Sequence, residues 1–154
     1  MNRIARIASL ALAAAVASLS LPASADDAKQ EAIKYRQAVF KVVGWNFKPM
    51  GAMVKGETPY DKAAFQRMAD NLAFASKLAL EGFAPGTDAL AGETRAKDDI
   101  WKKNDDFKSK MAEFEKASAA LAQAAQGGDM AAIKPAFGKT ADTCKSCHKA
   151  YRED

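Results

Sequence analysis

The chain has 154 residues, a length typical of one domain, and its 23 Lys and Arg residues against 19 Asp and Glu give a formal net charge of +4. The basic residues do not form a run interleaved with aromatic residues, so the sequence gives no support for binding of nucleic acid. Two cysteines and one histidine are too few for the four nitrogen and sulfur ligands of a structural zinc site.

Residues 1–25 are typical of a secretory signal peptide. Arg3 and Arg6 precede an apolar run over residues 7–21, and small residues suited to signal peptidase end the segment. The apolar run is shorter than the roughly 20 residues that span a bilayer. We therefore expect cleavage at the end of this segment. Residues 26–154 would then form one exported, periplasmic domain with no membrane anchor and a formal net charge of +2.

The rest of the chain predicts four amphipathic helices and no strand. Apolar residues recur at intervals of three and four, and Gly and Pro residues separate the segments. The expected helices cover residues 28–53, 61–80, 96–126 and 129–152. Four such helices, each with one apolar stripe, predict an all-α fold, an antiparallel up-down-up-down four-helix bundle.

Capping signals set the expected helix ends. Asp61 and Asp129 are expected N-caps, and Gly127 with Gly128 is expected to end the third helix. Pro49 is expected to bend or loosen the last turn of the first helix, because it removes one backbone N–H. The loop between the second and third helices, about 14 residues long, is the longest irregular segment, and such loops commonly carry function.

Cys144, Cys147 and His148 form a C-x-x-C-H motif, the signature of covalent attachment of a c-type haem. On a helix, positions i, i+3 and i+4 share one face, so both thiols can reach the two vinyl groups on one edge of a porphyrin. The imidazole of His148 lies on the same face and is expected to bind the iron as an axial ligand. We therefore expect one covalent haem c.

Other uses of the two cysteines fit the sequence less well. A disulfide is the usual expectation in an exported protein, but here a histidine follows the second cysteine directly. A thioredoxin-like C-x-x-C needs a βαβ setting, which the helical pattern lacks. Because His148 is the one histidine, a second histidine ligand is excluded. The sixth iron position is left to Met, Lys, a ligand from solution or no ligand.

Several further segments resemble the cytochrome c′ family, which belongs to the class II c-type cytochromes. In chain order, the resemblance is carried by Tyr35-Arg36-Gln37, Lys55-Gly56 with Pro59-Tyr60-Asp61, Phe83-Ala84-Pro85-Gly86-Thr87, Glu93-Thr94-Arg95-Ala96-Lys97 with Ile100-Trp101, and Cys144-Lys145-Ser146-Cys147-His148-Lys149-Ala150-Tyr151-Arg152. It covers essentially the whole chain after the signal peptide. The resemblance implies the same bundle fold and five-coordinate, high-spin iron. It also implies electron transfer or binding of diatomic gases such as nitric oxide and carbon monoxide, and a homodimer.

The resemblance also implies contacts at the haem periphery. Arg36 and Gln37 match positions of the first helix that contact the haem edge, and a guanidinium is well suited to the propionate carboxylates. Glu93 and Thr94 match a loop that also touches the haem edge in similar proteins.

Two more residues are placed near the iron by the resemblance. Phe40 stands where low-spin relatives have a Met ligand, so a Phe there implies a distal pocket without a protein ligand. Arg152 matches a basic residue beside the proximal face.

Three hypotheses about function are open at this point. The first is a high-spin periplasmic cytochrome that binds gases or exchanges electrons with redox partner proteins. The second is a low-spin electron carrier with a Met or Lys sixth ligand. The third is an enzyme such as a peroxidase. It is disfavoured because no distal histidine or acid–base partner is found near Phe40, so we expect no enzymatic activity.

Overall fold

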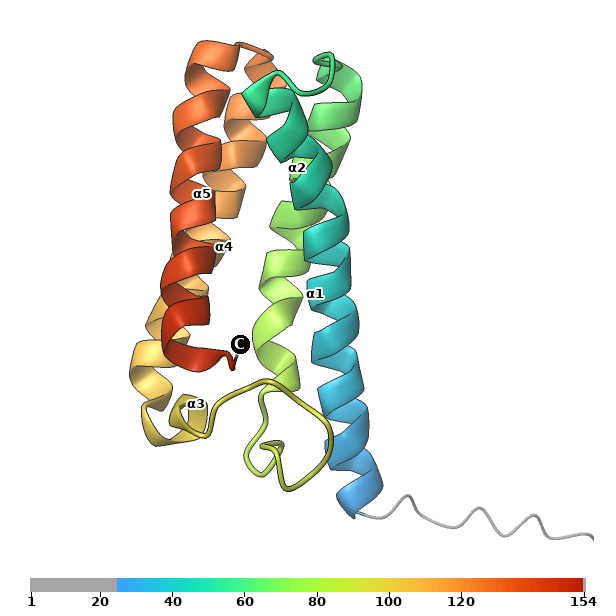
Figure 1. Cartoon of the computed structure of the whole chain (residues 1–154), viewed down its shortest axis with the longest axis vertical. Helices are drawn as coiled ribbons and strands as arrows, with labels where there is room; N and C mark the ends of the chain where they lie inside the picture. The colour runs from blue at the N-terminus through green and yellow to red at the C-terminus, as the bar shows by residue number, and fades with distance from the viewer. Residues whose placement is uncertain (1–24, 154) are drawn as a thin grey trace, which may run out of the picture.

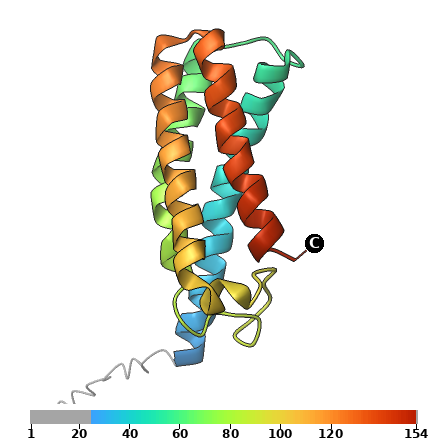
Figure 2. The same ribbon diagram turned by 90° about the vertical axis from the view of Figure 1, so that its left-hand side faces the viewer.

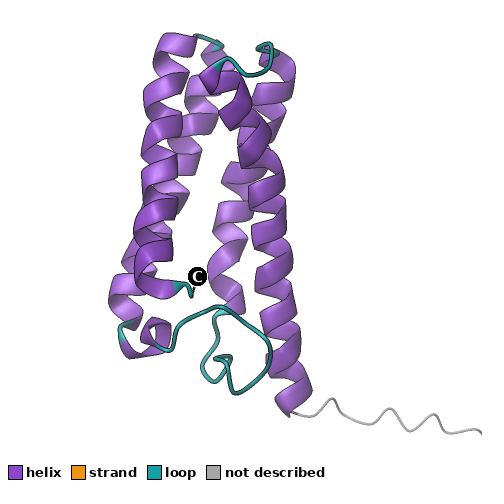
Figure 3. Cartoon of the chain, in the orientation of Figure 1, coloured by secondary structure: helices purple, strands orange, loops and turns teal. Residues whose placement is uncertain are grey.

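The computed structural model describes residues 25–153 as a helical bundle (Figures 1 and 3). Its long helices are α1 (Ala25–Lys55), α2 (Lys62–Leu78), α4 (Asn104–Gly127) and α5 (Met130–Tyr151). A 3-10 turn, η1 (Ala79–Gly82), continues α2, and the single-turn helix α3 (Asp99–Lys102) precedes α4. Successive long helices run in opposite directions (Figure 1), so the predicted antiparallel four-helix bundle is confirmed.

The expected signal peptide lies outside the described residues, apart from Ala25, at which α1 begins. Within residues 25–153, none of the helices combines the length and the apolar character needed to cross a bilayer.

The predicted caps are confirmed. The carboxylate of Asp61 accepts a hydrogen bond of 2.9 Å from the backbone N–H of Ala64, and Asp129 caps α5 by accepting one of 2.9 Å from Ala131. Gly128 ends α4 in the left-handed conformation, with φ of 75°. Helix α1 continues through the exposed Pro49 to Lys55.

The prediction of one continuous helix over residues 96–126 is wrong. Ala96 and Lys97 instead lie beside the C-terminus: Ala96 forms an isolated bridge with Arg152, and the N–H of Lys97 donates to the carbonyl of Tyr151 over 3.0 Å. Lys103, with φ of −119° and ψ of 45°, then separates α3 from α4. The pairing of residues 95–97 with the end of the chain accounts for the late start of the helix, because it joins residues far apart in the sequence, which helical spacing does not reveal.

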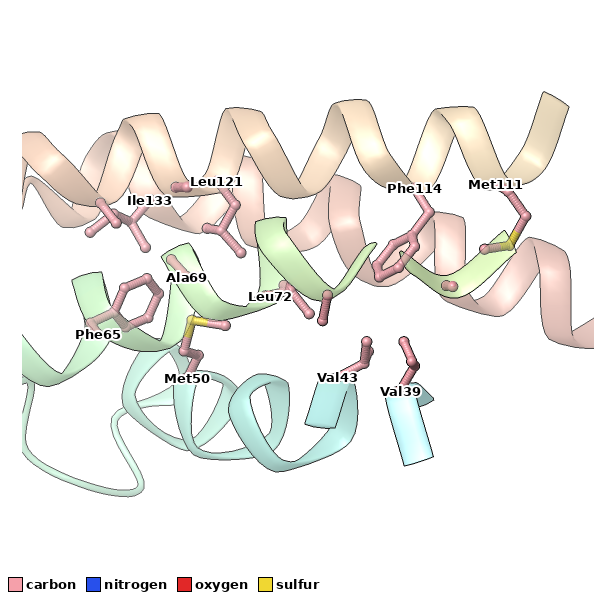
Figure 4. Close-up of a cluster of buried hydrophobic side chains, with 14 of the residues drawn as sticks. Val39, Val43, Met50, Phe65, Ala69, Leu72, Met111, Phe114, Leu121 and Ile133 are labelled. Atoms are coloured by element: carbon pink, nitrogen blue, oxygen red, sulfur yellow. The ribbon is translucent and has the colours of Figure 1, made fainter. Parts of the chain in front are cut away.

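One hydrophobic core runs along the bundle (Figure 4). Its fully buried large side chains include Met50, Phe65, Leu72, Ile100, Phe107, Leu121 and Ile133. Each such side chain stabilises the fold by roughly 1.5–3 kcal/mol through burial. Helix α1 packs against α2, α2 against α4, and α4 against α5. Helices α1 and α5 pack against each other much less closely (Figure 2).

Candidate haem-binding site

The C-x-x-C-H motif lies on the last two turns of α5, as predicted. Cys144, Cys147 and His148 are each half-buried, and the two cysteines are free thiols rather than a disulfide. Thr143 and Tyr151 on the same turns are buried and fix the orientation of this part of the helix. The three motif side chains therefore share one face that is neither sealed in the core nor fully in solvent.

Burial keeps the motif groups neutral. It raises the pKa of Cys144 and raises that of Cys147 to about 11, although nearby Lys110 opposes the shift at Cys147. Burial also lowers the pKa of His148, and the positive charges of Arg152 and Arg95 lower it further. A neutral imidazole has a free ring lone pair, which is the form that binds iron.

Arg152 lies against His148. This agrees with the resemblance, which implied a basic residue beside the proximal face at this position. Its Nη1 is 3.5 Å from Nε2 of His148, one helical turn away. The segment after α5 is tied to the loop between η1 and α3, since the N–H of Glu153 donates to the carbonyl of Arg95 over 2.8 Å. This loop therefore lies next to the motif.

Phe40, on α1, faces the region of the C-x-x-C-H motif. Phe47 of α1 stacks on Phe137 of α5 with 4.3 Å between ring centroids, which sets the register of these two helices. Phe40 lies seven residues before Phe47, and Cys144 seven residues after Phe137. Because α1 and α5 are antiparallel, Phe40 and Cys144 are at the same level of the bundle. Phe40 is half-buried, on the α1 face that looks across toward α5.

Arg36 lies one turn before Phe40 and is buried, with 2% of its surface exposed. Its Nη1 donates to the carbonyl of Gly82 over 3.0 Å and to the hydroxyl of Thr87 over 2.9 Å, and its Nη2 donates to the hydroxyl of Thr94 over 2.8 Å. The guanidinium also lies 4.8 Å from the ring centroid of Phe83.

Every hydrogen-bond acceptor that Arg36 has in the described chain is neutral. Burial lowers its pKa to about 10, and the negative charge of Asp88 opposes that shift, so the side chain is a cation at neutral pH. A buried charge needs a counter-charge to offset its lost hydration. Three of its five N–H donors make the bonds described above, which leaves two for an anionic group.

The other predicted periphery residues gather around Arg36. Thr94 accepts its hydrogen bond, and the side-chain amide of Gln37 donates to the backbone carbonyl of Glu93 over 2.9 Å. The structure thus brings together Arg36, Gln37, Glu93 and Thr94, although they come from two segments far apart in the sequence.

Some residues of this region had no separate signal in the sequence. Gly82 is required because an added Cβ would lie 2.5 Å from Cβ of Arg36. Thr87 is 1% exposed and belongs to the loop segment that resembled the family. Tyr151 donates a hydrogen bond to Asp106 and packs edge-on against Phe107. Only the fold reveals these pairings, because their members are far apart in the sequence.

The residues present fit a covalent haem. The thiols and the neutral imidazole of the motif share one half-buried face of α5, and α1 presents the apolar Phe40 at the same level. Arg36, a buried cation with two spare N–H donors, lies one turn before Phe40. Within the described residues, no group of three or more His, Cys, Asp or Glu side chains is placed to hold a metal ion by itself.

Comparison with known proteins also supports a haem-binding site. A family model described as cytochrome c′ matches residues 31–152. The cytochrome c′ of Halomonas halodenitrificans is 36% identical, over 81% of this chain and 98% of its own. The solved structure of cytochrome c prime from Shewanella frigidimarina is 47% identical, with a TM-score of 0.79 over 82% of this chain and 97% of its own.

A further solved structure is a nitric oxide complex of a variant of the cytochrome c prime from Alcaligenes xylosoxidans. It is 34% identical to this chain, with a TM-score of 0.75 over 82% of this chain and 96% of its own. Family match, whole-chain identity and the C-x-x-C-H face of α5 agree, and the chain belongs to the cytochrome c′ family, whose cofactor is covalently bound haem c.

Proposed function

We propose that this protein is a mono-haem carrier that exchanges electrons with redox partner proteins and binds diatomic gases such as nitric oxide and carbon monoxide, without catalysing a reaction. The observation that carries the proposal is that Cys144, Cys147 and His148 share one half-buried face of α5, level with Phe40 of α1. The haem supplies a reversible one-electron change and an iron position for a small ligand.

The residues of the chain have distinct roles in this proposal. Cys144 and Cys147 form the two thioether links, and His148, kept neutral by burial, is the axial ligand. Arg36 pairs through its two spare N–H donors with a propionate, which offsets its buried charge. Gln37, Glu93 and Thr94 are near the haem edge, and Arg152 is beside His148 on the proximal side.

We propose that the protein gives the iron no sixth ligand, so that the iron is five-coordinate and high-spin. His148 is the one histidine, and Phe40 has no atom that binds iron. Met53 lines a cavity together with Met130, and Met130 lies 18 residues before His148 on α5, about 27 Å away along the helix. Met50 is fully buried next to Phe65 (Figure 4).

The alternative is a low-spin electron carrier with a Met ligand. Met111 is the methionine nearest the level of the motif, because its neighbour Lys110 donates to the hydroxyl of Ser146 over 3.4 Å. It is 5% exposed and belongs to the hydrophobic core, next to Phe114 on α4 (Figure 4). This position supports a packing role for Met111.

An absorption spectrum of the ferrous protein tests the coordination. A five-coordinate iron has broad high-spin bands, and these should be the same in Met111→Leu. Phe40→Met should shift the spectrum toward low spin. Sharp low-spin bands in the wild type that Met111→Leu abolishes would establish the alternative.

Gas binding in the proposal is supported by the nitric oxide complex of the Alcaligenes relative and by the apolar distal side at Phe40. We further propose a periplasmic location, with residues 1–25 cleaved as a signal peptide. The support is the charged start, the apolar run and the small residues before position 26.

We also propose that the protein forms a homodimer through α1 and α2. Trp45 is 82% exposed, Phe74 67% and Val42 48%, an unusual exposure for large apolar side chains. The amide of Asn71 donates to Asn46 over 3.2 Å, which aligns these antiparallel helices so that Trp45, Val42 and Phe74 lie near one another. A second copy would present the same patch, so a two-fold contact would bury apolar surface against apolar surface.

A further inference from the structure

Lysines line both sides of the seam between α1 and α5, the line along which these two helices face each other. The stacking of Phe47 on Phe137 fixes this seam. On each helix, two residues at the seam are followed directly in the sequence by an exposed lysine. These pairs are Phe40-Lys41 and Phe47-Lys48 on α1, and Cys144-Lys145 and His148-Lys149 on α5.

Helix geometry places all four lysines on the solvent side of the seam. Successive residues turn by about 100° around a helix axis. One step back from Phe40 leads to Val39, which is buried in the core. One step back from Cys144 likewise leads to the buried Thr143. The step forward therefore leads away from the core on both helices. Because α1 and α5 are antiparallel, these forward steps turn in opposite senses and reach the same outer side of the bundle.

This outer side of the seam is positively charged. The ion pairs found within residues 25–153 do not include Lys41, Lys48 or Lys149. The Nζ atom of Lys145 is 3.8 Å from Oδ1 of Asp142, but both side chains are largely exposed, and a surface pair of this kind contributes little. Unpaired charges of one sign that lie close together attract an anionic surface.

The excess of positive charge is local to this side of the bundle. Helix α5 carries four lysines against one aspartate. Helix α4, of similar length, carries three lysines against four acidic residues. The positive surface beside the seam is therefore not a consequence of the small net charge of the whole chain.

The lysines also flank the residues that the proposed function assigns to the haem. Lys145 and Lys149 directly follow Cys144 and His148. A protein that docks across the seam therefore lies beside the cofactor. Helix α5 takes no part in the α1–α2 contact proposed for the homodimer, so its two lysines remain free in a dimer. An anionic lipid bilayer would also attract these lysines, but lipid headgroups neither give nor accept an electron.

We propose that the seam lysines, Lys41, Lys48, Lys145 and Lys149, form the docking surface for an acidic one-electron carrier protein. The inference rests on the electron-carrier function proposed above, and it names the surface and the class of partner. One electron leaves the reduced protein and reduces the oxidised partner, and no bond is made or broken. Opposite charges steer the two proteins together, and salt weakens this attraction.

Oxidation of the reduced, haem-loaded protein tests this surface by charge in stopped-flow mixing. Hexacyanoferrate(III) is an anionic oxidant and tris(phenanthroline)cobalt(III) a cationic one, and each accepts one electron. Poly-L-glutamate, added as an acidic polypeptide, competes for the docking surface. Intact mass and absorption spectra report whether each variant carries haem as the wild type does.

Three double variants, each with the same change in net charge, are compared with the wild type. They are Lys145→Glu with Lys149→Glu on α5, Lys41→Glu with Lys48→Glu on α1, and the control Lys108→Glu with Lys116→Glu on α4. The control lysines are also exposed and belong to none of the ion pairs within residues 25–153, but they are not beside the seam. The α5 variant is decisive, because α5 is outside the contact proposed for the dimer.

All variants should carry haem with the wild-type spectrum. At low salt, hexacyanoferrate(III) should oxidise each seam variant several-fold more slowly than the wild type, and their combination about tenfold or more slowly. The cationic cobalt complex should instead react faster with the seam variants. Poly-L-glutamate should slow the reaction of the wild type with hexacyanoferrate(III) but not that of the combined variant. The control should change these rates little, and all differences should vanish at about 1 M salt, where screening is nearly complete.

Equal slowing in the control and in the α5 variant would overturn the inference, because net charge rather than this surface would then set the rate. The inference would also be wrong if poly-L-glutamate had no effect on the wild type while phosphatidylglycerol vesicles bound the wild type but not the α5 variant. That result would assign the surface to a membrane. A haem-loaded wild type that neither reagent oxidises would instead contradict the electron-carrier function itself.

Discussion

The guanidinium of Arg36 on α1 donates a hydrogen bond of 2.8 Å to the hydroxyl of Thr94, which lies 58 residues later in the loop between η1 and α3. The same side chain binds Thr87 of that loop and the carbonyl of Gly82 at its start. One buried cation therefore ties the first helix to both ends of the longest irregular segment.

Replacing Arg36 should loosen this loop. Arg36→Met leaves a buried carbonyl and two hydroxyls without their donor, which should lower the free energy of unfolding by about 1–3 kcal/mol. Arg36→Lys should recover only part of the loss, because an ammonium lacks the planar fork that reaches both threonines. Urea unfolding followed by circular dichroism measures the change, and hydrogen exchange should show lower protection in residues 83–98.

Lys34→Met is the matched control, since Lys34 lies on the same helix with an exposed side chain that pairs with Glu31 one turn away. It should change stability little. Equal losses for Lys34→Met and Arg36→Met would show that the bonds from Arg36 to the loop do not stabilise the fold.

Much of the bundle was predictable because it depends on local signals. Apolar spacing identified the long helices, and the caps at Asp61, Asp129 and Gly128 were confirmed. The C-x-x-C-H motif was predictable for the same reason, since its three residues are neighbours on one helical face. The late start of this helix was not predicted, because Arg95 and Lys97 pair with the backbone at the C-terminus, far away in the sequence, rather than with a next helical turn.

The surroundings of Arg36 were predictable only in part. The resemblance singled out Arg36, Gln37, Glu93 and Thr94, and the structure gathers them, but the sequence alone does not indicate which groups bond to which. Those bonds join residues 46 to 58 positions apart, so they depend on how α1 packs against the loop.

Alkaline pH should destabilise the protein through Tyr151. The hydroxyl of Tyr151 is buried and donates a hydrogen bond to Asp106. Burial is the larger cause, and the hydrogen bond to Asp106 the next, of a rise in the pKa of Tyr151 from 10.0 to about 12. As pH rises, Tyr151 loses its hydroxyl proton at a lower pH in the unfolded chain than in the folded protein. The contribution of this hydroxyl to the free energy of unfolding is therefore fully present below about pH 10 and is lost as pH rises toward 12.

The check is the pH dependence of the unfolding free energy for the wild type and Tyr151→Phe. The variant should be less stable at neutral pH and should lack the part of the decline between pH 10 and 12 that belongs to this group. Tyr35→Phe provides a comparison, because Tyr35 is on the surface and bonds to Glu81. Identical alkaline profiles for the wild type and Tyr151→Phe would contradict the assignment.

The apolar patch of Trp45, Val42 and Phe74 should determine the oligomeric state. Sedimentation velocity of the haem-loaded protein should show a dimer, and Trp45→Glu should convert it to a monomer by placing a charge in the contact. Leu90→Glu is the control, because Leu90 is 98% exposed but lies in the loop before α3, away from the α1–α2 face. A dimer that persists in Trp45→Glu would exclude this surface as the contact.

Intact mass of the exported protein after denaturation tests the haem assignment most directly. Expressed in a bacterium that matures c-type cytochromes, the protein should have the mass of residues 26–154 plus one haem, and the haem should stay bound in acidic organic solvent. Cys147→Ser should make attachment partial or abolish it. Recovery of the polypeptide mass alone, with the haem extracted into the solvent, would contradict covalent attachment at Cys144 and Cys147 and with it the proposed function.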